Sequence, residues 1–194
     1  SLAQMAALGS TVAILAGSHP DSPESFAYAL GFTTLGAALF ALTRSDEKGR
    51  VPQEAIIGIV YVMASAAAIL VADRTPRGGE AIKDILVGSL LWVTWPAILR
   101  LAAVYAVIGL LHWVLRYRFL TISFHPETAV AEGWSIRWWD FWFYLSFGIV
   151  ITFSVPIAGV LLVFSFLVVP AAIAFQFTRR KGALAIISWV AGAA

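Results

Sequence analysis

The placement of charged residues constrains the fold of this chain more than any other feature. Asp, Glu, Lys and Arg are absent from six long stretches, which are 1–20, 25–43, 55–72, 85–99, 101–115 and 141–178. A charged side chain at the centre of a bilayer costs at least ~2.5 kcal/mol, and a spanning helix needs about 20 apolar residues. The pattern therefore predicts a chain that crosses a lipid bilayer several times.

Composition supports the same interpretation and excludes several classes of protein. Of the 194 residues, 60% are hydrophobic and 12% are charged, and the mean hydropathy is +0.86. A water-soluble globule of this composition would precipitate. The formal net charge of +2 is too small for nucleic-acid binding. The chain has no cysteine, which excludes disulfides, a thiolate nucleophile and Cys-ligated metal sites.

The uncharged stretches predict an all-α, polytopic membrane bundle of seven or eight segments. These are 2–17, 25–43, 54–72, 82–93, 95–115, 138–154, 157–177 and one that begins at 182. The runs are too long for the strands of a membrane barrel and do not alternate. The chain starts without Met and both ends lie inside apolar runs, so we expect a fragment truncated at both ends.

Two of the predicted segments need a special arrangement. The long uncharged stretch is divided at Ser154, Pro156 and Gly159, which predicts a tight helical hairpin. The segment 82–93 is counted as a crossing although its apolar run covers only about two thirds of the length that a crossing needs, so we expect protein to surround it.

Basic residues indicate the orientation. If the long polar gap at 116–140 is cytoplasmic, strict alternation also places 18–24, 73–84 and 179–181 inside. The inner side then has nine Lys and Arg, and the outer side has the remaining four, which are Arg44, Lys48, Arg50 and Arg100. The positive-inside rule favours this orientation.

Residues with catalytic chemistry are few. The chain has three His, no HExxH and no GxSxG motif. His19 is typical of a surface turn, and His112 of the headgroup level beside Trp113. Glu54 follows Pro52 at a helix start, where capping and the mouth of an ion path are alternatives.

The polar gap contains a short helix that Pro126 and Glu127 open and Gly133 ends. Aromatic residues flank it on both sides. Such a helix either lies on the membrane surface or presents a knob to a soluble partner, and the residues alone leave both alternatives open.

Several short stretches match one family in order and spacing. They are Phe124-His125-Pro126-Glu127 with Ala131 and Gly133, Trp139-Asp140-Phe141, Gly159 to Val163, Val169 to Ala174, Glu54 to Ile59, and Gly88 to Leu91. Together these stretches resemble the permease subunits of ABC importers for zinc, manganese and iron, and the resemblance covers nearly the whole chain.

The resemblance implies one transmembrane permease domain over 1–194, with a fold similar to that of cobalamin importers. Its implied partners are a second permease copy, an ABC ATPase subunit, an extracytoplasmic solute-binding protein and the lipid bilayer of a bacterial inner membrane. The chain itself would be no enzyme, because ATP binds on the partner subunit; no covalent cofactor is expected, and the metal ion is cargo.

Within that family the cytoplasmic segment 116–137 docks on the ATPase. The implied coupling residues are Phe124, His125, Pro126, Glu127, Ala131 and Gly133. His125 replaces the Asp of the family's Phe-Asp-Pro-Glu motif, which alters one contact.

The transport path is less well marked, and the metal ligands stay unknown. Gln4 stands where many members have His, and Gln is a poor ligand for zinc or manganese. Candidate pathway or gating residues are Gln4, Glu54, Gly88 and the helix-kinking Pro170. A secondary transporter or channel is the alternative function, and an intramembrane enzyme is a third; the stretches lack the embedded carboxylates or paired nucleophile and base that these need.

Overall fold

A computed structural model describes the chain except for residues 1, 21, 44–51, 76–77, 179–180 and 194. All regular elements in the described part are helices. They are α1 (Leu2–Leu15), α2 (Pro23–Leu42), α3 (Gln53–Ala72), α4 (Gly78–Val87), η1 (Leu90–Trp92), α5 (Trp95–Phe124), α6 (Pro126–Ala131), α7 (Ile136–Phe177) and α8 (Lys181–Ala193). The all-α class is confirmed, whereas the likeness to cobalamin importers stays a prediction.

Four of these helices are long and apolar enough to cross a membrane, namely α2, α3, α5 and α7. The apolar helices α1 and α8 are shorter. α5 continues to Phe124 instead of ending at 115 as predicted. Arg116 and Arg118 do not end it, because basic residues favour helices and reach the aqueous phase with their long side chains.

The segment 82–93 is no continuous helix, and the prediction that protein surrounds it holds only for its first part, where Ile85 and Leu86 pack against the core. α4 ends before Gly88, whose φ of 71° turns the chain, and the single turn η1 then leads into α5. Leu91 and Trp92 are 94% and 85% exposed. The length of this apolar run fits a short helix that turns back on one side of the bundle as well as it fits a short crossing. The length therefore did not predict the turn at Gly88.

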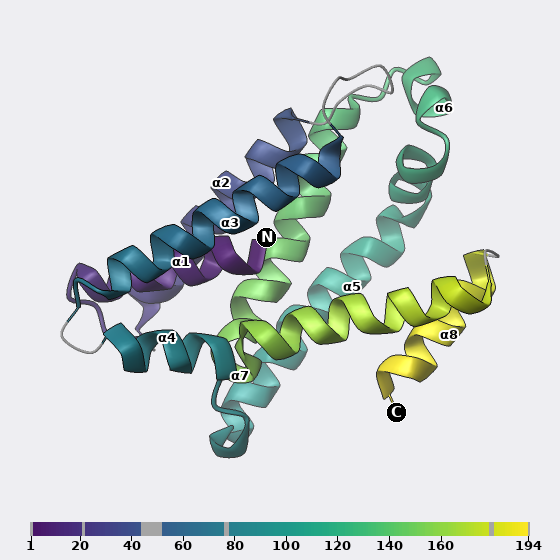
Figure 1. The fold of residues 1–194 in the computed structure, drawn as a ribbon. Coiled ribbons are helices and arrows are strands. Elements are labelled where there is room, and N and C mark those ends of the chain that lie inside the picture. The colour runs from purple at the N-terminus through teal and green to yellow at the C-terminus, as the bar shows by residue number, and fades with distance from the viewer. Residues whose placement is uncertain (1, 21, 44–51, 76–77, 179–180, 194) are drawn as a thin grey trace.

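Gly159 divides α7 into two halves, 136–158 and 160–177, and we call this point the elbow. Its φ of 75° and ψ of 155° lie outside helical geometry, while Pro156 stays within the helix. Figure 1 shows the halves diverging from the elbow, so the predicted division is confirmed but the tight hairpin was wrong.

The elbow packs directly against the end of α4. A Cβ on Gly159 would collide with Leu86 O and Val87 C, and one on Gly88 would collide with the backbone at 157–159. The Ser89 amide donates a hydrogen bond to Ile157 O at 3.0 Å. Two glycines are required here because two backbones meet without space for side chains.

α2 runs antiparallel to the first half of α7. Their contacts, from the elbow outward, are Phe26 with Phe153, Thr33 with Thr152, and Phe40 with Tyr144. The Thr33 and Thr152 hydroxyl oxygens lie 3.2 Å apart, yet each hydroxyl lies within hydrogen-bond distance of a carbonyl in its own helix, Ala29 O or Gly148 O. This packing places the end of α2 beside the start of α7.

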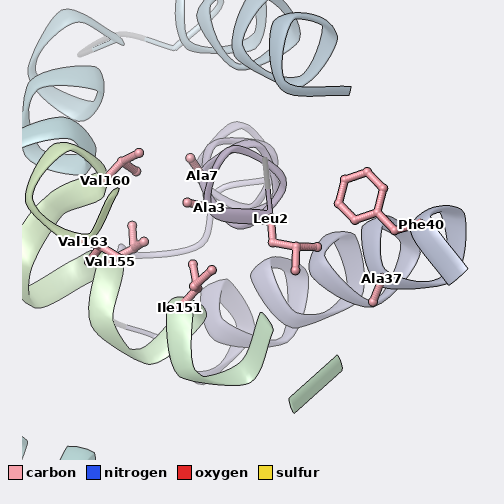
Figure 2. Close-up of a cluster of buried hydrophobic side chains, with 9 residues drawn as sticks. All are labelled: Leu2, Ala3, Ala7, Ala37, Phe40, Ile151, Val155, Val160 and Val163. Carbon is pink, nitrogen blue, oxygen red and sulfur yellow. The ribbon is translucent and has the colours of Figure 1, made fainter. Parts of the chain in front are cut away.

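The core lies where α1, α2 and both halves of α7 meet (Figure 2). Its buried side chains are Leu2, Ala3, Ala7, Ala37, Phe40, Ile151, Val155, Val160 and Val163. Small residues bring α1 close to α2: a Cβ on Gly9 would lie 2.6 Å from Tyr28 O. Such close approach is typical of helices packed in a bilayer.

The contacts divide the bundle into an α6 end and an elbow end. α5 is antiparallel to α7, because Tyr105 contacts Ser154 near the elbow and Phe119 contacts Trp139 near α6. Gln53, at the start of α3, donates a hydrogen bond to Phe40 O, so α2 ends and α3 begins at the α6 end. The turn at 18–20 and the end of α4 therefore lie at the elbow end.

This arrangement corrects the predicted topology, which placed 18–24 and 73–84 on the same side as 116–140. Counting 82–93 as a crossing reversed the sides of everything before it. In the sequence, the connections between α2 and α3 and between α5 and α7, with the helix ends beside them, contain six Lys and Arg, and those at the elbow end contain four. The three at 179–181 are left out of this comparison, and on this count the positive-inside rule favours a cytoplasmic α6. The six are Arg44, Lys48, Arg50, Arg116, Arg118 and Arg137, and the four are Arg74, Arg77, Lys83 and Arg100.

Replacing Gly159 by Ala tests the elbow. The conformation is accessible almost only to glycine, and the new methyl group would collide with α4, so we expect a loss of about 1–3 kcal/mol in stability. Gly58→Ala is the control, because a Cβ there meets nothing within 4 Å. Thermal unfolding of the purified membrane protein measures both, and equal unfolding temperatures would contradict the close contact.

Candidate functional site

The predicted coupling residues lie within 124–134, a compact segment at the α6 end that we call the α6 unit. His125 ends α5, where its amide donates to Thr121 O at 2.7 Å, and Pro126 occupies the first turn of α6. Gly133, with φ of 76°, lies near the end of the unit, and its amide donates to Val130 O at 2.9 Å. The local signals in the sequence thus predicted α6 correctly.

One face of α6 is anchored and the other is exposed. Ala129 is completely buried, and the Trp134 amide donates to its carbonyl at 2.9 Å. Phe124 and Val130 are 48% and 61% exposed, and the side chain of Glu127 is exposed. Figure 1 shows α6 at the extremity of the bundle. A helix that is anchored on one face and exposes both apolar and charged side chains on the other suits contact with a soluble protein.

A cavity of about 390 Å³, lined by polar and apolar side chains, lies at the elbow end, between α1, the turn before α2, and α4. We call it the outer cavity. Its polar lining consists of Ser10, His19, Ser25, Asp84 and Ser89. Gly88 also lines it, together with apolar side chains. An imidazole and a carboxylate in one cavity supply two groups that bind divalent cations.

A second cavity of about 170 Å³, the inner cavity, lies between α1, α3 and α4. Ile85 lines both cavities, which makes them neighbours along α4. The polar side chains of the inner cavity are Gln4, Thr11, Tyr61 and Ser65. Gln4 is 8% exposed, and the buried Ser65 hydroxyl has no hydrogen-bond partner among the described residues. Neutral oxygen atoms of this kind bind water or a hydrated cation weakly.

The four predicted pathway residues do not gather at one site. Gln4 lines the inner cavity and Gly88 the outer one. Glu54 is exposed in the first turn of α3 at the opposite end of the bundle. Pro170 is buried in the second half of α7, where it lines a hollow shared with α8.

Sequence reasoning missed His19 and Asp84 as cavity residues. His19 resembles an ordinary turn residue, and Asp84 fell in a loop assigned to the cytoplasm. A carboxylate four residues before a turn glycine, within a short apolar helix, was the available signal. Among the residues that the structure describes, no three His, Asp or Glu side chains are grouped to hold a metal ion.

Comparison with known proteins adds information about ancestry. The profile of the ABC 3 transport family matches residues 1–194. The manganese transport system membrane protein MntC of Listeria monocytogenes is 25% identical over 188 residues, covering 91% of this chain and 65% of MntC. The chelated iron transport system membrane protein YfeC of Yersinia pestis is 25% identical over 174 residues, covering 86% and 59%.

One solved structure has the same fold. It is PsaBC from Streptococcus pneumoniae in complex with Fab, with a TM-score of 0.73 and 21% identity. The alignment covers 99% of this chain and 66% of that one. The chain thus spans about two thirds or less of the length of these relatives.

Proposed function

The chain belongs to the ABC 3 transport family, and we propose that it acts as the permease part of an ATP-driven importer. The proposed cargo is a divalent metal ion, namely zinc, manganese or iron, or a chelate of one. The names of relatives that carry manganese or chelated iron support this cargo class.

The observation that carries the proposal is the α6 unit. It is seated on the bundle by buried Ala129 and exposes Phe124 and Glu127 at the end that is richer in basic residues. An ATPase subunit that binds this surface would move α6 and, through it, the ends of α5 and α7. The ATPase supplies the hydrolysis, and the permease supplies two arrangements of packed helices.

We assign the outer and inner cavities to the cargo path. The outer cavity opens at the elbow end, where an extracytoplasmic solute-binding protein would deliver the ion in a bacterial inner membrane. Asp84 and His19 would attract it, and the neutral oxygens near Gln4 would hold it only weakly. A transport path needs sites that bind strongly enough for capture and weakly enough for release.

A second permease copy has a suitable surface on α5. None of the residues in the most apolar window of this helix is buried in the single chain. Dimerisation along α5 would cover this surface and leave α6 accessible to the ATPase.

Glu127→Ala tests the coupling role. Removing an exposed carboxylate at the centre of the proposed contact should weaken binding of the ATPase subunit about tenfold, or ~1.4 kcal/mol. Glu132→Ala is the matched control, because Glu132 is also exposed but follows the last residue of α6. Copurification of the ATPase with each variant gives the result, and equal retention would contradict the assigned contact.

Asp84→Asn tests the outer cavity. The amide keeps the shape of the side chain but loses the negative charge that attracts a divalent cation, so Mn²⁺ uptake at limiting concentration should fall about tenfold. Asp73→Asn is the control, since Asp73 is exposed just after α3 at the same end and does not line the cavity. Uptake by reconstituted vesicles at the unaltered rate would remove this cavity from the path.

A further inference from the structure

We propose that Arg118 is a positioning residue that couples α6 to the membrane helices. This inference rests on the proposed function, and it identifies the side chain that would transmit movement of α6. Arg118 is exposed near the end of α5, six residues before Phe124.

The Arg118 guanidinium contacts two tryptophans on different parts of the chain. Its Cζ lies 5.5 Å from the ring centre of Trp134, in the connection between α6 and α7, and 4.8 Å from that of Trp139, in the first turn of α7. We call these three residues the clamp. Guanidinium groups at such distances are attracted to aromatic faces. The clamp therefore joins α5, the end of the α6 unit and α7 through one side chain.

The clamp continues into the bundle through packed aromatic rings. Trp139 contacts buried Phe119 with ring centres 5.9 Å apart, and Phe119 stacks on His112 at 5.0 Å. His112 Nε2 lies 3.3 Å from the hydroxyl oxygen of buried Ser146 on α7. Close-packed rings do not compress, so displacement of Trp139 is passed to Phe119 and His112. A shift of the α6 unit reaches the interior of the α5–α7 pair by this route.

Arg116 provides an internal comparison. It lies two residues earlier on α5 and also covers a tryptophan, with Cζ 4.5 Å from the ring centre of Trp113. That contact stays within α5, because Trp113 is three residues earlier on the same helix. Two arginines thus share charge, helix, exposure and type of contact, and only Arg118 connects α5 to the α6–α7 link.

The test uses the full transporter with its ATPase, reconstituted in vesicles, and measures Mn²⁺ taken up per ATP hydrolysed. Arg118→Gln should retain the ATPase but lower this ratio about two- to fivefold, the factor expected for loss of an exposed cation–π contact. Arg118→Lys should lie in between, because it keeps the charge without the planar group. Arg116→Gln should leave the ratio unchanged.

A double-mutant cycle shows whether the clamp is the cause. Arg118→Gln and Trp139→Leu both remove the Arg118–Trp139 contact, so their combined effect on the ratio should be smaller than the sum of the two single effects, whereas those of Arg118→Gln and Trp113→Leu should add. Equal losses in the Arg116 and Arg118 variants, an unchanged ratio in Arg118→Gln, or additive effects with Trp139→Leu would each overturn the inference. Failure of the unaltered permease to retain an ATPase would instead overturn the proposed function and this inference with it.

Discussion

The contact between Gly88 and Gly159 determines how the two parts of the chain share the membrane. Because two backbones touch at this point, α4 turns back at the elbow and does not cross. The segments before and after it consequently share their ends: α2 and α3 meet at the α6 end, as do α5 and α7. The outer cavity lies at the other end, so the proposed cargo entrance and the ATPase contact are separated by the length of the bundle.

Charge placement predicted where helices lie but not which of them cross. Within the described residues each uncharged stretch is mostly helical, except 85–99, which contains the turn at Gly88 and η1. The cost of burying a charge applies to every spanning segment alike. The segment 82–93 shows where this reasoning ends. A helix that crosses the membrane and one that turns back have the same apolar composition. The turn at Gly88 depends on its contact with Gly159, which is 71 residues later in the sequence. One miscounted crossing then reversed the sides of 18–24 and 73–84.

Some features of the candidate sites depend on neighbouring residues in the sequence, and others depend on contacts between distant residues. Pro126 and Gly133 act on their own backbone, so the sequence alone predicted α6. His19 and Asp84 line one cavity only because α4 packs beside the start of α2, and no spacing rule connects them. Arg118 was missed for a similar reason: a cation–π contact leaves no pattern in the sequence, and its two tryptophans stood out only as aromatic residues that flank the short helix.

The hydroxyl groups between α2 and α7 have a mechanical consequence. Thr33 and Thr152 can each give their only proton to a carbonyl of their own helix, so the two oxygens need not share a hydrogen bond. In that arrangement a small displacement of α2 along α7 breaks no hydrogen bond between the two threonines. Only the packing of the side chains then resists such a displacement at this point. The closely packed aromatic rings at the α6 end resist deformation. The bundle therefore combines a rigid region at the α6 end with a contact between α2 and α7 that allows a small displacement.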